Sequence, residues 1–170
     1  MAAQGASVRK EDTREMVLDY DTGLPANLDA ERTILGAILL DNAAHAEAAE
    51  KLTDEDFSLD SHRRIFLRMT ELMNTNHAVD IVTLADILSR NKTGDTREIE
   101  SIGGVAYLAS LTEGLPRRPV IREYILIVKE KAKLRRIMLV CSAAIAECAD
   151  QMVTASSIVT KMGPQLRGIK

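Results

Sequence analysis

The sequence is poor in aromatic residues, cysteine, proline and glycine, which argues against a disulfide-bonded protein and favours a helical one. Its 170 residues include 3% aromatic residues, no tryptophan, 2 cysteines, 4 prolines and 9 glycines. Cys141 and Cys148 lie on one expected helix, on the order of 10 Å apart along its axis, which is too far for a disulfide bond. With 46% apolar residues, the composition favours a small helical module with a real core.

Long hydrophobic runs are also missing. No apolar stretch approaches the ~18 residues that a membrane-spanning helix needs. The first residues carry Arg9, Lys10, Glu11, Asp12 and Arg14 and no apolar segment, which argues against a secretory signal. We therefore expect a cytoplasmic protein without a membrane partner.

Sequence motifs for chemistry are absent as well. No G-x-x-x-x-G-K-[S/T] loop for nucleotide phosphates occurs, and the pair Gly103–Gly104 predicts a tight bend between helices instead. Ser61 and His62 form no catalytic triad, because adjacent helical residues point about 100° apart. The three histidines have no partner at metal-ligand spacing: His45, His62 and His77. We expect no catalytic, metal or cofactor site in this chain.

The apolar periodicity predicts an all-α fold that begins with a compact multi-helix head. Helices are expected near residues 28–40, 43–52, 61–74 and 80–88, with a further short one after Gly104. Thr53 with Asp56 three residues later opens a turn, Asp80 caps a helix, and residues 91–94 end it. We take Glu31, near the start of the first helix, as a charge that stabilises a helix N-terminus.

A long helix should follow, from Pro119 to about Asp150, or some 30 residues and roughly 45 Å. Its apolar residues recur at three- and four-residue steps and require a partner helix, either the segment from Thr154 onward or another subunit. Gly163–Pro164 is expected to interrupt that return segment. The apolar positions are Ile121, Ile125, Val128, Ala132, Leu134, Met138, Cys141, Ile145 and Cys148. The expected organisation is a disordered tail over 1–23, a head over 24–116, and a long helix with a hairpin over 117–170.

Charge is unevenly distributed behind a net charge of −3. Residues 1–60 hold 14 acidic and 5 basic side chains, whereas residues 117–136 hold 8 basic and 2 acidic ones. The basic cluster suits DNA or an acidic partner, but we favour a solvated face or a subunit contact, because Tyr124 is the one aromatic residue nearby. Its members are Arg117, Arg118, Arg122, Lys129, Lys131, Lys133, Arg135 and Arg136.

Five sequence blocks in order resemble the amino-terminal domain of bacterial replicative DNA helicases of the DnaB family. The resemblance covers residues 24–136. The blocks are LPANLDAERTILGAILLDN at 24–42, DF at 56–57 with DSHRRIF at 60–66, VDIVTLADIL at 79–88, IGGVAYL at 102–108, and EYILIVKEKAKLRR at 123–136.

The resemblance implies a non-catalytic collar of a hexameric helicase, followed in that family by a motor domain that binds ATP and magnesium. It implies that hairpins pair subunits into dimers, that three dimers form the hexamer, and that the collar docks the carboxy-terminal helical domain of primase. Contact with DNA would come through the parent helicase. Contact residues carried over by motif are Tyr107, Leu134, Met138, Cys141 and Ile145.

Several alternatives stay open at this point. Tyr107 also fits a half-buried core residue, and Met138, the expected exposed apolar contact, also fits packing within the hairpin. The chain fits either a fragment of a helicase or a relative without a motor. A stand-alone helicase adaptor or inhibitor, and a helical nucleic-acid-binding module that uses the basic cluster, are the alternative functions.

Overall fold

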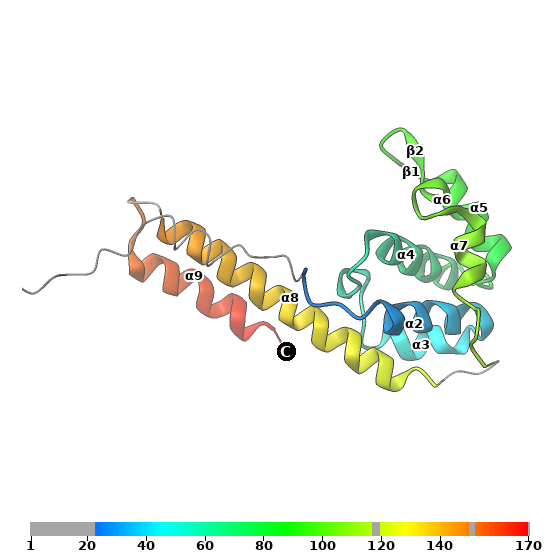
Figure 1. Ribbon diagram of the computed structural model, residues 1–170, viewed down its shortest axis with the longest axis horizontal. Coiled ribbons are helices and arrows are strands. Elements are labelled where there is room, and N and C mark those ends of the chain that lie inside the picture. The colour runs from blue at the N-terminus through cyan, green and yellow to red at the C-terminus, as the bar shows by residue number, and fades with distance from the viewer. Residues whose placement is uncertain (1–22, 117–119, 150–151, 170) are drawn as a thin grey trace, which may run out of the picture. The chain divides into compact units, whose positions relative to one another are not determined.

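The computed structural model describes residues 23–116, 120–149 and 152–169. Figure 1 shows that the structure is built mainly of helices, with one short pair of strands, which confirms the all-α prediction. They divide into two compact units, one over residues 25–134 and one over residues 135 onward. The expected disordered tail lies outside the described residues except for Gly23, and the expected domain boundary between 116 and 117 stays a prediction. None of the described helices is long and apolar enough to cross a membrane.

The first unit is the helical head, whose elements follow the predicted order closely. Its 3₁₀ turn η2 (Asp54–Asp56) was expected from Thr53, which makes a capping box with Asp56. Its α-helices are α2 (Leu28–Leu40), α3 (Ala43–Ala49), α4 (Asp60–Asn74), α5 (Ile81–Arg90), α6 (Glu98–Ser101), α7 (Gly104–Ser110) and the beginning of α8 (Arg122–Cys148).

Helix α2 contributes several buried residues to the core of the head, among them Ile34, Leu35 and Ile38. Asn27 caps it, because its side chain accepts a hydrogen bond from the Ala30 amide at 3.0 Å. Its Gly36 lies against the segment after α7: a Cβ there would come 2.0 Å from the Leu111 carbonyl oxygen and 2.7 Å from Leu115 Cδ1. Glycine therefore allows α2 and this segment to approach one another closely.

Local hydrogen bonds set the limits of α5, as the sequence predicts. The Asp80 carboxylate accepts from the amides of Val82 and Thr83, both at 2.8 Å. The break after Arg90 holds a two-stranded antiparallel hairpin that we did not predict, β1 (Lys92–Thr93) and β2 (Thr96–Arg97). Each strand has only two residues, too few for an alternating pattern to be visible in the sequence.

Helix α8 begins at Arg122, three residues later than expected, and Pro119 lies outside the described residues. Ile121, directly before the helix, and Ile125 and Val128 within it form an apolar stripe that packs in the core of the head. The partner of this stripe is therefore the head itself, rather than the return segment or another subunit. The head core also contains Ile34, Leu35, Ile38, Phe57, Ile65, Phe66, Met69, Leu84, Leu88 and Leu108.

The second unit is a helical hairpin made by the later part of α8 and by α9 (Ala155–Arg167). Figure 1 shows α9 beside α8, and Lys161 on α9 pairs with Glu147 on α8. The Thr154 side chain caps α9 by accepting from the Ser157 amide. The return segment that we expected is thus present.

The interruption expected at Gly163–Pro164 does not occur, because α9 continues through Pro164 to Arg167. Proline removes only one backbone hydrogen bond in the last turn of the helix. The carbonyl that loses this bond belongs to Thr160, which is exposed, so a water molecule can donate a hydrogen bond to it instead.

We predict that Gly36→Ala destabilises the head, although alanine ordinarily favours a helix over glycine by roughly 0.5–1 kcal/mol. The added methyl group would overlap the backbone at Leu111, and such overpacking lowers the free energy of unfolding by about 1–3 kcal/mol. Urea denaturation measures the change. The matched control is Gly163→Ala, whose Cβ would meet only the flexible Arg167 guanidinium at 3.3 Å. A stabilising effect of Gly36→Ala would contradict the close approach.

Candidate functional site

Tyr107 is the candidate contact residue in the head, and it lies half-buried on the short helix α7. Two glycines precede it, with φ angles of 104° at Gly103 and 76° at Gly104. They make the tight bend between α6 and α7 that the sequence predicts. A Cβ on Gly103 would also come 3.1 Å from Tyr107 Cβ, so glycine here leaves room for the tyrosine.

The Tyr107 hydroxyl belongs to a buried polar network that joins α7, α4 and α2. It lies 2.7 Å from His62 Nε2, and His62 Nδ1 lies 2.7 Å from Glu31 Oε2. The other carboxylate oxygen, Glu31 Oε1, accepts from the Ser58 amide at 2.8 Å. The His62 side chain is 0% exposed and that of Glu31 is 1% exposed. The network therefore fixes Tyr107 to the interior of the head.

The direction of each hydrogen bond follows from the charge of Glu31. Burial raises the pKa of Glu31, but hydrogen bonds from His62 and Ser58 outweigh burial and hold that pKa below its ordinary value. An ionised carboxylate can only accept hydrogen bonds, so His62 donates from Nδ1. In a neutral ring Nε2 then accepts, and the Tyr107 hydroxyl donates to it.

This order of tyrosine, histidine and carboxylate resembles the arrangement that activates a nucleophile, but the phenol is not activated. Burial raises the pKa of Tyr107 more than the neighbouring Arg32 lowers it, and the Glu31 carboxylate adds a smaller rise. The hydroxyl therefore stays protonated at neutral pH. The geometry supports a role in positioning the ring and not a catalytic one.

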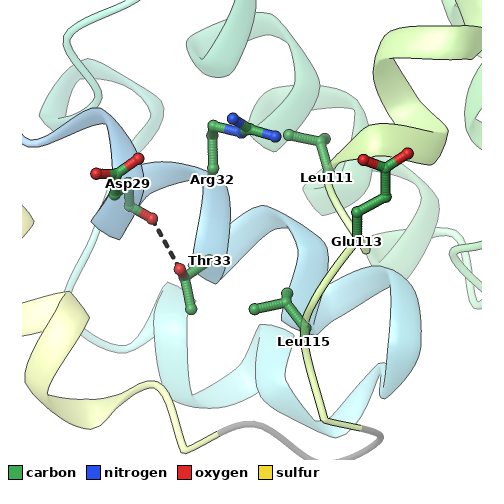
Figure 2. A pocket seen from close by; sticks show the side chains of 6 residues that line it. All are labelled: Asp29, Arg32, Thr33, Leu111, Glu113 and Leu115. Carbon is green, nitrogen blue, oxygen red and sulfur yellow. Dashed lines mark hydrogen bonds between the residues drawn. The ribbon is translucent and has the colours of Figure 1, made fainter.

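A shallow pocket of about 200 Å³ lies between α2 and the segment after α7. Figure 2 shows Arg32 reaching across it toward Leu111, with Thr33 and Leu115 facing one another below. The Arg32 guanidinium donates to the Ser110 carbonyl at 3.3 Å, and Thr33 Oγ1 donates to the Asp29 carbonyl at 2.7 Å. Small-molecule sites usually have roughly 300–1,000 Å³. The pocket is therefore large enough for a single side chain rather than a nucleotide.

The four candidate contact residues on α8 differ in exposure. Leu134 is 38% exposed and Ile145 is 45% exposed, whereas Met138 and Cys141 are half-buried. Met138 is thus less exposed than we expected, and its neighbour Leu139 is the freely exposed apolar residue of that turn. Leu139 points about 100° further around the helix than Met138. The sequence alone does not show which of these two directions the rest of the protein covers, so it could not tell which residue is exposed.

The basic cluster does not form one exposed patch among its described members. Lys129 pairs at 2.8 Å with Asp56, which is fully buried in η2. Arg135 is buried, Arg122 is exposed, and three others are half-buried: Lys131, Lys133 and Arg136. Arg117 and Arg118 lie outside the described residues. This arrangement weakens the interpretation as a nucleic-acid-binding surface.

Sequence reasoning missed the buried network because each member had an ordinary local explanation. A usable signal was present: Glu31 shares a helical face with Ile34, Leu35 and Ile38, all of which are buried. His62 likewise shares a face with the core residues Ile65, Phe66 and Met69. A polar residue on an apolar face points to a buried partner. Across the described part of the chain, His, Cys, Asp and Glu side chains form no group of three suited to a metal ion.

Comparison with known proteins finds a family model that matches residues 23–130, the DnaB-like helicase N terminal domain. The chain is 37% identical over 114 residues to the replicative DNA helicase DnaB of Geobacillus stearothermophilus, covering 67% of this chain and 24% of that protein. It is 33% identical over 135 residues to DnaB of Treponema pallidum, covering 79% of this chain and 30% of that protein. The chain thus spans about a quarter of the length of these relatives.

Two solved structures are similar in fold. The N-terminal domain of DnaB helicase from Mycobacterium tuberculosis matches with a TM-score of 0.75 and 27% identity, covering 85% of this chain and 99% of that one. A structure of a DnaB-like replicative helicase and its interactions with primase matches with a TM-score of 0.66, covering 85% of this chain and 32% of that one. At 21% identity, the second likeness shows the fold alone.

We predict that Lys129→Met lowers the free energy of unfolding by about 1–3 kcal/mol, because it removes the cation beside the buried Asp56 carboxylate. Chemical denaturation of the head measures the loss. Lys131→Met makes the same change two residues away at a half-buried position, and should have little effect. Equal effects of the two variants would show that Lys129 has no special structural role.

We also predict a pH-dependent contribution from Glu31. Its pKa in the folded protein lies below the ordinary value of 4.5, so its stabilising effect is present above pH 4.5 and is lost as the pH falls through the folded value. The difference in unfolding free energy between wild type and Glu31→Gln should therefore be largest near neutral pH and should shrink below pH 4.5. The exposed Glu47→Gln is the control. A difference that is constant with pH would contradict an ionised Glu31.

Proposed function

This chain belongs to the DnaB-like helicase N-terminal domain family, and on that premise we propose that it is the collar domain of a replicative DNA helicase in the cytoplasm. In this role it holds the subunits of the helicase ring together and docks primase during DNA replication. It contributes no ATPase site of its own. ATP, magnesium and the main contact with DNA belong to the motor domain of the parent helicase.

The observation that carries the assembly function is the α8–α9 hairpin with its exposed apolar side chains. Ile137, Leu139 and Ile145 are exposed on α8, and Val159 and Leu166 are exposed on α9. Apolar residues gathered on two packed helices favour association with another protein surface. A second copy of the chain is the occupant that we propose, first as a dimer and then as three dimers in a hexamer.

The docking function rests on α7 and α8. Tyr107 is half-buried on α7, and an aromatic ring anchored in this way is typical of the residues that dominate protein interfaces. A DnaB-like helicase of the same fold has been described with its primase interactions. This likeness supports the carboxy-terminal helical domain of primase as the partner, with Tyr107 and the positions Leu134, Met138, Cys141 and Ile145 as contacts.

The test is the mass in solution, by light scattering behind a sizing column, of the 18.7 kDa chain alone and with the primase domain. We expect a dimer or larger assembly that takes up the primase domain. Ile145→Glu should lower the association constant of the dimer at least tenfold, because it places a charge in the apolar contact between subunits. Ala146→Glu, at the neighbouring exposed position, should leave this constant unchanged. A wild-type monomer that ignores primase would refute both parts of the proposal.

A further inference from the structure

We propose that Glu31 and His62 are positioning residues for Tyr107: they hold its hydroxyl inside the head, so that the ring meets the docked primase domain in one orientation. The inference rests on the proposed docking function and adds two buried residues to it. Neither residue reaches the surface, so neither can contact a docked partner directly.

The first support is the geometry that anchors the phenol. Three helices contribute one member each: Glu31 from α2, His62 from α4 and Tyr107 from α7. Both links of the chain are 2.7 Å long, and the rings of His62 and Tyr107 are nearly parallel, at 16° with centroids 6.2 Å apart. His62 holds the hydroxyl from beyond the end of the tyrosine ring, and the planes of the two rings are nearly parallel.

The second support is the donor order that an ionised Glu31 and a neutral His62 ring give together. The Ser58 amide occupies one oxygen of Glu31, and His62 Nδ1–H must donate to the other. The only proton of the Tyr107 hydroxyl is then directed at His62 Nε2. The hydroxyl then has no proton to donate to a docked partner, and the ring is the part of Tyr107 that we propose as the main docking contact.

A third support is that α7 is tied to α2 at a second point. Arg32 follows Glu31 directly in α2, and its guanidinium donates to the Ser110 carbonyl one turn beyond Tyr107. The helix that carries Tyr107 is therefore held on both sides of the ring. A pre-formed contact of this kind avoids the loss of rotamer freedom on binding.

The expected effect is modest and specific. Ordering one side chain on binding corresponds to about a two- to tenfold change in Kd. Tyr107→Phe keeps the ring but frees it from His62, so we expect primase affinity to fall by about that factor. Tyr107→Ala removes the ring itself and should reduce affinity by more than tenfold.

The test is a double-mutant cycle on primase binding, measured by isothermal titration calorimetry with the full chain and the primase carboxy-terminal domain. The variants are His62→Gln, Tyr107→Phe and the pair together. If His62 acts through the tyrosine hydroxyl, His62→Gln should weaken binding in the wild-type background and add nothing in the Tyr107→Phe background. The control is His45→Gln, the same change at another buried histidine, whose ring bonds Thr70 instead.

A second measurement does not depend on binding. Nitrogen-15 NMR of the histidine rings should show His62 protonated at Nδ1 and not at Nε2 in the wild type, with this signature changed in Glu31→Gln. Each outcome is decisive. Equal effects of His62→Gln in both backgrounds, or a His62 protonated at Nε2, would overturn the inference while leaving the docking function intact. No binding by the wild-type chain would overturn the docking function and the inference with it.

Discussion

A carboxylate inside the apolar core of the head is the constraint on which much of this structure depends. Placing an ionised group away from water is strongly unfavourable unless hydrogen bonds surround it. Glu31 meets this requirement by accepting hydrogen bonds from the Ser58 amide and from Nδ1 of His62. Nε2 of His62 then requires a hydrogen-bond donor, and the Tyr107 hydroxyl is that donor. One buried charge therefore specifies how α2, α4 and α7 are arranged, as apolar packing alone would not.

The helices were predictable from the sequence because their signals are local. Asn27, Asp80 and the Thr53–Asp56 pair cap elements in the positions expected, and three- to four-residue periodicity located the core faces. The all-α fold followed from such signals, whereas the family and the choice of a return helix came from the resemblance of the five sequence blocks. The interruption expected at Pro164 was wrong because the low helix propensity of proline applies to the interior of a helix, whereas Pro164 lies in the last turn of α9.

The candidate site was predictable only in part. Tyr107 emerged from its motif, but its partners lie 45 and 76 residues earlier in the chain, and neither has an unusual local sequence. Lys129 was grouped with its basic neighbours, although its partner Asp56 lies 73 residues away. Pairings over such distances depend on how helices are arranged in space, and one sequence contains no direct record of this arrangement.

The same limit explains why the apolar positions of the long helix were interpreted as one continuous contact with a partner helix, although the first half of the helix is covered by the head.

The separation of these partners along the chain also bears on how the head folds and unfolds. The Glu31–His62, His62–Tyr107 and Asp56–Lys129 contacts close loops of 31, 45 and 73 residues. Closing a loop opposes chain entropy, so contacts between distant residues tend to form after the local helices. Interactions absent from the folding transition state chiefly slow unfolding. We therefore expect the buried polar contacts of this domain to form late in folding and to lengthen the lifetime of the folded head.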